Sequence, residues 1–190
     1  MILVADASPV IFLAKLNRLN LVRDVFSGTI LMPDSVRREL VHDNIPLHER
    51  ERINAFLEGC RVEPVRAPRS GVAAALSLAD RHVLALAGQH PRARIMTDDG
   101  VVRRIALAEG LSVMGTLGLI IRAAHGKIMT RPDARRAVDA LIGEHRMRVS
   151  VDLYQEAMRQ LSPDISPRVA KRRETPKYPN TQIPKENPMT

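Results

Sequence analysis

The sequence has few of the residues that stabilise small secreted proteins. Tryptophan is absent, aromatic residues make up 3% of the 190 positions, and Cys60 is the single cysteine. One cysteine excludes an internal disulfide framework and a zinc site built from several cysteines. No apolar run approaches the roughly 18 residues of a membrane span, and Asp6 interrupts the apolar run near the N-terminus where a signal peptide would lie. We therefore expect a cytoplasmic protein that does not bind membranes.

The charge of the chain is strongly positive. Lys and Arg number 29 against 21 Asp and Glu, for a formal net charge of +8, and hydrophobic residues make up 45% of the chain. That hydrophobic fraction is enough for a sizeable core built from Leu, Val, Ile and Ala. A basic protein favours a polyanionic partner, nucleic acid before membrane, although many basic proteins bind neither.

The last 29 residues differ in composition from the rest. Residues 162–190 hold six of the thirteen prolines, six basic and three acidic residues, and little apolar content. We predict a folded domain over residues 1–161 and a basic, proline-rich, disordered tail over 162–190. The tail either contacts nucleic acid or is a solvated extension without a role.

Short apolar segments alternate with helical patterns along the predicted domain. The expected strands are Ile2–Ala5, Thr29–Met32, Arg61–Pro64, Ala93–Met96 and Leu111–Met114. The expected helices are Pro9–Leu16, Leu19–Phe26, Asp34–Val41, Leu47–Leu57, Val72–Ala87, Gly100–Glu109, Thr116–His125, Pro132–His145 and Val151–Leu161. Strands separated by helices predict an α/β fold, with a mostly parallel sheet covered on both faces and extra C-terminal helices.

Two of the predicted strands end in carboxylates. Asp6 follows the first strand, and Asp98 and Asp99 follow the fourth. Parallel sheets bind ligands beyond the carboxyl ends of their strands, so these residues are candidates for a site. A helix cap is the alternative for each aspartate. In the first segment, Ser8 fits the N-cap position with Pro9 at N1, which leaves Asp6 free for another role.

Two further acidic residues lie on predicted helices. Asp80 falls among apolar residues at helical spacing, between Leu76 and Leu84, so we expect it to be buried and to need a cation there. That cation is an Arg or Lys in a salt bridge, or a metal ion. Glu39 flanks the apolar face of its helix, where a solvated position is the simpler interpretation.

Together the four carboxylates can converge at one edge of the sheet. Such a cluster repels itself unless divalent cations neutralise it, and oxygen ligands without Cys or His favour Mg²⁺ or Mn²⁺. Metal-assisted phosphodiester hydrolysis uses this chemistry. An acidic pocket on a basic protein then predicts a nuclease whose surface holds the nucleic acid backbone.

The order of these motifs resembles the PIN-domain family of metal-dependent ribonucleases. The motifs are Asp6 with Ser8, Pro33 to Leu40 with Glu39, Leu76 to Ala87 with Asp80, and Thr97 with Asp99, followed by the Gly-Thr-Leu-Gly segment from Gly115. The resemblance covers residues 2–161. It extends to a prokaryotic PIN-like subfamily similar to the toxin half of VapBC-type toxin–antitoxin pairs.

The resemblance implies an α/β/α sandwich and a hydrolase that cuts RNA phosphodiester bonds. Its expected site comprises Asp6, Glu39, Asp80 and Asp99 as catalytic ligands of Mg²⁺ or Mn²⁺, Asp98 as an extra ligand, Ser8 and Thr97 as supporting residues, and Arg103 and Arg104 as phosphate contacts. The two arginines could equally be solvated. RNA, an antitoxin protein and a second copy of the chain are the partners that the resemblance implies.

One departure from the family supports another hypothesis. Close relatives often carry a second glutamate two residues before the third acidic position, where this chain has Leu78. A PIN-like module that binds RNA or protein with little or no cleavage is therefore the alternative. A phosphatase with an aspartate nucleophile is less favoured, because Ser8 stands where such an enzyme would want a second aspartate.

Overall fold

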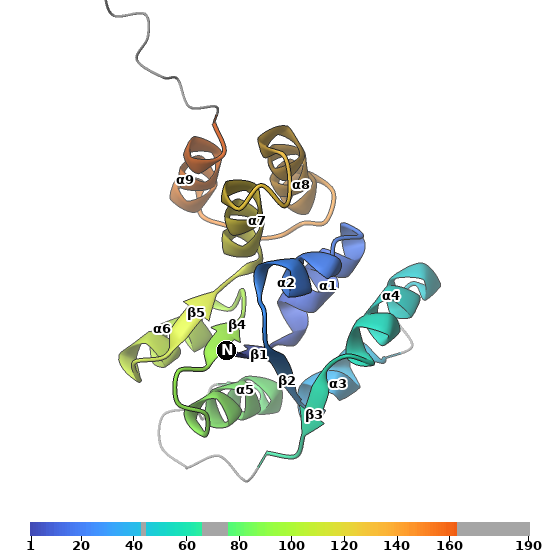
Figure 1. Ribbon diagram of the computed structural model, residues 1–190, viewed down its shortest axis with the longest axis vertical. Coiled ribbons are helices and arrows are strands. Elements are labelled where there is room, and N and C mark those ends of the chain that lie inside the picture. The colour runs from blue at the N-terminus through green and yellow to red at the C-terminus, as the bar shows by residue number, and fades with distance from the viewer. Residues whose placement is uncertain (43–44, 66–75, 163–190) are drawn as a thin grey trace, which may run out of the picture.

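A computed structural model describes residues 1–42, 45–65 and 76–162 of the chain. Five parallel strands form its central sheet in the order β3-β2-β1-β4-β5 (Figure 1). The strands are β1 (Ile2–Ala5), β2 (Thr29–Pro33), β3 (Arg61–Glu63), β4 (Arg94–Met96) and β5 (Ser112–Met114). Each lies within one residue of its predicted bounds at either end, and the predicted α/β fold with a parallel sheet is confirmed.

The strand order reverses direction at β1. β1 pairs with β2 on one side, where Val4 lies opposite Leu31, and with β4 on the other, where Val4 lies opposite Ile95. The chain first builds outward through β2 to β3 and then returns to add β4 and β5 beyond β1. The crevice between the carboxyl ends of β1 and β4 is therefore the topological switch point, where open α/β sheets bind their ligands.

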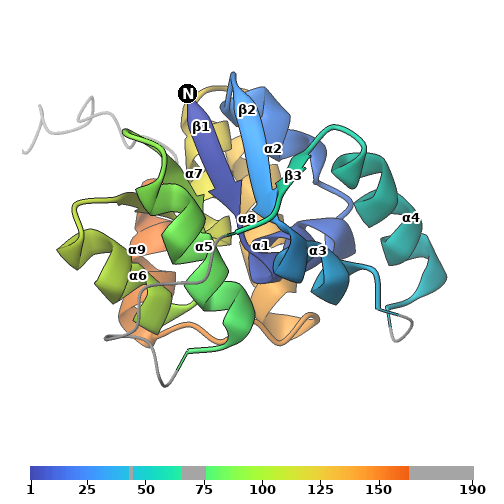
Figure 2. The same cartoon turned by 90° about the horizontal axis from the view of Figure 1, so that it is seen from below.

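Helices cover both faces of the sheet (Figures 1 and 2). The helices are α1 (Ala7–Lys15), α2 (Asn20–Val25), α3 (Asp34–Leu40), α4 (Leu47–Leu57), α5 (Leu78–Gly88), α6 (Gly100–Ala108), α7 (Thr116–His125), α8 (Arg131–Gly143) and α9 (Val151–Gln160). Helix α5 packs on β1, β2 and β4 with α6 beside it, whereas α1, α2, α4 and α7 lie on the opposite face. Helix α3 contacts both α1 and α5, so it lies at the carboxyl edge between the layers.

Two helices begin more than one residue away from their predicted starts, because polar side chains cap them there. Helix α1 starts at Ala7 with Asp6 as its N-cap, so Ser8 is not the cap, and Pro9 lies within the first turn. Helix α5 starts at Leu78 with Ser77 as its N-cap, so Leu76 precedes the helix, and the predicted positions 72–75 lie outside the described residues.

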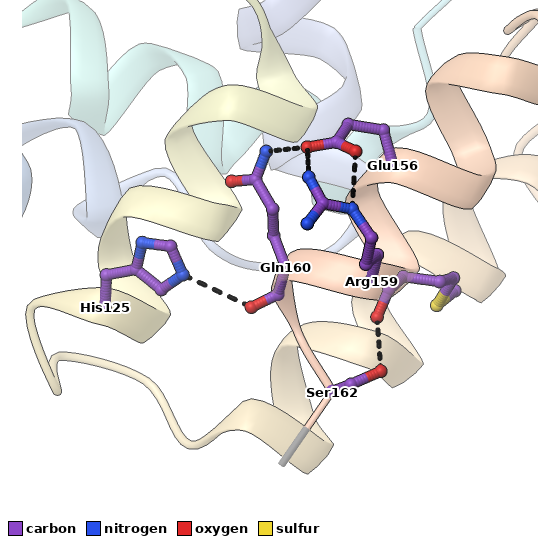
Figure 3. A network of polar contacts seen from close by, with 6 residues as sticks. His125, Glu156, Arg159, Gln160 and Ser162 are labelled. Carbon is purple, nitrogen blue, oxygen red and sulfur yellow. Dashed lines mark hydrogen bonds and ion pairs between the residues drawn. The ribbon is translucent and has the colours of Figure 1, made fainter. Parts of the chain in front are cut away.

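Helices α7, α8 and α9 form the C-terminal part of the described domain. The end of α9 is tied to α7, because His125 Nε2 donates a hydrogen bond to the Gln160 carbonyl oxygen at 3.2 Å (Figure 3). Within α9, Arg159 and Gln160 both bind the Glu156 carboxylate, and Ser162 Oγ donates to the Met158 carbonyl. The predicted tail lies outside the described residues from position 163. None of the helices in the described ranges is long and apolar enough to cross a membrane.

Candidate active site at the carboxyl edge of the sheet

Asp6 lies at the centre of the switch point and is nearly inaccessible to solvent. It is 5% exposed, and its backbone N–H donates to the Met96 carbonyl of β4 at 3.0 Å. The Ala7 N–H donates to Asp6 Oδ1 at 2.7 Å, and Thr97 Oγ1 donates to Oδ2 at 2.7 Å. The carboxylate is therefore held at both oxygens. Because Asp6 is itself the N-cap of α1, the inference from Ser8 that left it free of a capping role is wrong.

Thr97 connects the ends of β1 and β4. Its side chain is fully buried, and its hydroxyl donates to Asp6 while accepting from the Asp99 N–H at 3.1 Å. One hydroxyl thus orients the carboxylate of the first strand and the backbone of the loop after the fourth. The adjacency of these two strand ends, which the sequence analysis required, is present in the sheet.

The charges of two other carboxylates reach Asp6. Burial, with a smaller contribution from the negative charges of Asp80 and Glu39, raises the pKa of Asp6 to about 6 despite the hydrogen bonds from Thr97 and Ala7. Partial desolvation of the Glu39 carboxyl raises its pKa as well, and Asp80 adds to that rise. Asp6 follows β1, Glu39 lies on α3 and Asp80 on α5, so three separate parts of the chain bring negative charge together at one edge of the sheet.

The structure places Asp80 differently from its expected position on a buried stripe. Asp80 is half-buried in the first turn of α5, where its N–H donates to Ser77 Oγ and its Oδ2 accepts from the Ser77 N–H at 3.2 Å. This reciprocal pair is a capping box. The prediction that Asp80 is buried is wrong, because its side chain is half-buried and is used to cap the helix.

The two neighbouring aspartates after β4 point to different partners. Asp99 is exposed and caps α6, with Oδ1 accepting from the N–H groups of Val101 and Val102 at 2.7 and 2.8 Å. Asp98 accepts from the Thr116 N–H at 2.7 Å and from Thr116 Oγ1 at 2.5 Å, so it is bound to the start of α7. Within the described residues, Asp99 Oδ2 accepts no hydrogen bond, which makes Asp99 the better ligand candidate of the two.

The remaining predicted residues surround this edge. Ser8 is half-buried in the first turn of α1, two residues from Asp6. Arg103 Nη2 donates to the Thr97 carbonyl at 3.3 Å, and its charge offsets part of the rise in the pKa of Asp98 that burial causes. Arg104 is exposed one turn into α6. The sequence did not predict the contact of Thr116 with Asp98, although Thr116 belongs to the Gly-Thr-Leu-Gly segment that supported the family resemblance.

The donor set fits a hard cation that keeps most of its water. In the described part of the chain, no three Asp, Glu, His or Cys side chains are close enough to enclose a metal ion. Mg²⁺ is commonly bound by one or two carboxylates together with water and substrate phosphates, so a closed cage is not required. Asp6, whose burial disfavours an uncompensated charge, and the oxygen of Asp99 that accepts no hydrogen bond could serve as carboxylate ligands of that kind.

Comparison with known proteins agrees with the architecture. No curated protein shows a significant match to the chain. A family model described as a PIN domain matches residues 2–163, which include every strand of the sheet and all the carboxylates discussed above. The chain therefore belongs to the PIN-domain family, whose fold is that of a nuclease.

Proposed function

We propose that this PIN domain is a Mg²⁺- or Mn²⁺-dependent endoribonuclease that hydrolyses RNA phosphodiester bonds. One observation carries the proposal. Asp6 is buried at the switch point of the sheet, where burial raises its pKa to about 6 and the negative charges of Asp80 and Glu39 add a smaller part of that rise. Carboxylates that repel one another at a ligand-binding edge are stabilised when a divalent cation joins them.

Each residue has a distinct part in the proposed site. Asp6 is the innermost ligand, because Thr97 and the Ala7 N–H fix both of its oxygens. Asp99 would contribute its free oxygen, and Asp80 and Glu39 would hold the cation through water or position the attacking water. When bound, the metal ion supplies a Lewis acid for the phosphoryl group and lowers the pKa of a coordinated water. Arg103 and Arg104 lie beside this edge and offer positive charge to the RNA backbone.

The biological setting belongs to the same proposal. We infer that the protein acts in the cytoplasm as the toxin half of a toxin–antitoxin pair, with an antitoxin protein that blocks the acidic edge. We also propose a homodimer, which would place two acidic edges along one basic surface. Light scattering that reports a monomer at all working concentrations would contradict the dimer.

A PIN-like module that binds RNA or protein without cutting is the second candidate. It is favoured by the lack, among the described residues, of three side chains grouped for a metal ion. Leu78, where relatives often carry glutamate, is exposed at the start of α5 and gives no further ligand. Tight RNA binding without metal that survives Asp80→Asn would support this candidate.

Calorimetry with Mn²⁺ and Mg²⁺ tests the proposal most directly. We expect the wild-type protein to bind the ion and to cleave single-stranded RNA only in its presence. Asp6→Asn should lose binding and reduce cleavage at least a hundredfold, because positioned metal and acid–base groups contribute about 10² or more to the rate. Glu51→Gln, a matched neutralisation on the exposed face of α4, should change neither. If Asp6→Asn cleaved RNA as fast as the wild type, the proposal would be contradicted.

A further inference from the structure

A pocket lies beside the carboxylates and has no part in the proposed metal site. Its volume is about 410 Å³, and its lining includes Asp34, Ser35 and Arg38 of α3, His82 of α5, and Pro64 and Val65 after β3. Helix α3 contacts both α5 and β3, and Figure 2 shows the three elements meeting at the carboxyl edge. A volume of this size is in the range of pockets that bind small ligands.

The pocket and the acidic residues share their two helices. Arg38 precedes Glu39 on α3, and His82 follows Asp80 by two residues on α5. The pocket therefore lies within one helical turn of two of the carboxylates. A single ligand could therefore reach both the pocket and the carboxylates.

The polar side of the pocket is built by a contact between α3 and α5. Ser35 Oγ and His82 Nδ1 are 2.9 Å apart, so the serine fixes the imidazole and leaves Nε2 as the ring nitrogen available to a ligand. This pair is not a hydrolytic dyad, because the neighbouring Asp34 is engaged by Arg38 and the described residues place no carboxylate on His82. A fixed imidazole without a carboxylate partner is suited to binding a ligand rather than to activating a serine.

The other wall is apolar, and a positive charge lies at the rim. Pro64 is exposed and Val65 is half-buried, so both present aliphatic surface to the pocket. Arg38 is exposed and paired with Asp34. Exposed ion pairs contribute little free energy, so Arg38 can exchange this partner for a phosphate. Flat apolar faces with polar edges and a linked phosphate are the features of an unpaired nucleotide.

We propose that this pocket binds one unpaired nucleotide of the RNA, next to the phosphate that is cut. The base lies against the Pro64–Val65 wall, its polar edge meets His82 Nε2, and Arg38 binds the attached phosphate. The proposal rests on the proposed function, and it specifies the substrate as single-stranded RNA with a preferred base at one position. Sequence-specific recognition of RNA generally uses unstacked bases of this kind.

Nucleotide titration followed by NMR tests the pocket without relying on cleavage. The four ribonucleoside 5′-monophosphates are added to the metal-free wild-type chain, with inorganic phosphate in parallel. We expect one nucleotide to shift the His82 ring and Val65 methyl signals saturably, more tightly than phosphate does. Ser35→Leu, which fills the pocket, should weaken binding at least tenfold, and so should the milder His82→Ala. Ser112→Leu on the exposed part of β5 is the matched control and should bind as the wild type does.

Three outcomes would overturn the inference. The first is that no nucleotide shifts these signals, and the second is that phosphate alone shifts them equally. The third is that a short glutamate-rich peptide binds as well as a nucleotide, which would assign the pocket to a protein partner.

Cleavage of a randomised single-stranded RNA pool with Mg²⁺ separates this inference from the proposed function. We expect a preferred base beside the cut, and a tenfold loss of that preference in His82→Ala. Metal-dependent cutting without any base preference would contradict the pocket assignment and leave the nuclease proposal intact. Nucleotide binding in the pocket without RNA cleavage would support the pocket assignment and contradict the nuclease proposal.

Discussion

The buried carboxyl of Asp6 makes folding depend on pH in an unusual direction. Its pKa is raised from 3.8 to about 6 in the folded protein, so the folded state holds this proton more tightly than the unfolded state. The stability that the proton contributes is fully present below pH 3.8 and is lost as the pH rises through about 6. The difference between the two pKa values corresponds to about 3 kcal/mol in the free energy of unfolding.

Asp6→Asn should therefore stabilise the metal-free protein at neutral pH. We expect urea unfolding to give a higher free energy for the variant than for the wild type at about pH 7.5, by about 2–3 kcal/mol, and nearly equal values at about pH 4. Glu51→Gln should follow the wild type at both pH values. Saturating Mg²⁺ should raise the stability of the wild type alone. A variant less stable than the wild type at every pH would contradict the view that the ionised Asp6 carboxylate destabilises the fold.

Thr97 is the residue through which Asp6 and Asp99 are oriented together. Thr97→Val keeps the shape of the side chain but removes the donor to Asp6 and the acceptor for the Asp99 N–H. We expect it to lower the free energy of unfolding by about 2 kcal/mol and to weaken Mn²⁺ binding, measured by denaturation and calorimetry. Thr97→Ser should restore metal binding, since it returns the hydroxyl. Unchanged metal affinity in Thr97→Val would show that Asp6 does not need this partner.

At the scale of elements, the start of α7 is fixed to the site through Asp98. Both Asp98 oxygens accept from Thr116, and a Cβ at Gly115 would lie 2.7 Å from Asp98 Oδ1 and 2.9 Å from Arg103 Nη2. A side chain at this position would therefore have to displace the Asp98 carboxylate, which Thr116 holds by two hydrogen bonds. Because Asp98 lies between Thr97 and Asp99, the attachment of α7 also positions the loop that carries the site.

Gly115→Ala should disturb both stability and activity. We expect a loss of about 1–3 kcal/mol in the free energy of unfolding from the forced displacement, together with a drop in kcat. Gly143→Ala, at the end of α8 with no heavy atom near its new Cβ, is the matched control and should be neutral or slightly stabilising. Thermal unfolding of the two variants with the wild type measures the difference. Equal melting temperatures for Gly115→Ala and the wild type would contradict the close approach.

The strands and most helices could be predicted from sequence because their signals are local. Ile2–Ala5 is an apolar run that ends at a polar residue, and Leu47–Leu57 begins after a proline, so both bounds follow from neighbouring residues. The starts of α1 and α5 were missed because Asp6 and Ser77 cap them through their own side chains. In the first case the Ser8-Pro9 pair offered a competing cap signal.

Part of the site was also predictable, because it depends on where individual strands end. Parallel strands meet at one edge, so Asp6 and the loop from Thr97 to Asp99 could be expected together without knowing the strand order. The Ser35–His82 contact joins residues 47 positions apart, and the Asp98–Thr116 contact joins residues on two sides of β5. Nothing in the local sequence marks such pairs, because the first depends on the packing of α3 on α5 and the second on the pairing of β4 with β5.

At the scale of the whole molecule, the acidic edge lies on a chain with a net charge of +8. In the proposed ribonuclease, the cations that would attract RNA and the carboxylates that would cut it must therefore be separated on the surface. Arg104 is exposed on α6 within about one turn of Asp99, whereas Arg148 is exposed between α8 and α9, in the C-terminal part of the domain. If RNA binds across the switch point, Arg104 meets a phosphate and Arg148 does not.

The salt dependence of RNA binding measures this difference. Each phosphate contact to single-stranded nucleic acid contributes about −0.7 to the slope of log K against log salt concentration. Asp6→Asn prevents cleavage and serves as the background for fluorescence anisotropy with a single-stranded RNA. On it, Arg104→Gln should reduce the magnitude of the slope by about 0.7, and Arg148→Gln should leave it unchanged. Equal reductions in both variants would mean that the whole basic surface attracts RNA diffusely, and the binding path across the carboxyl edge of the sheet would have to be abandoned.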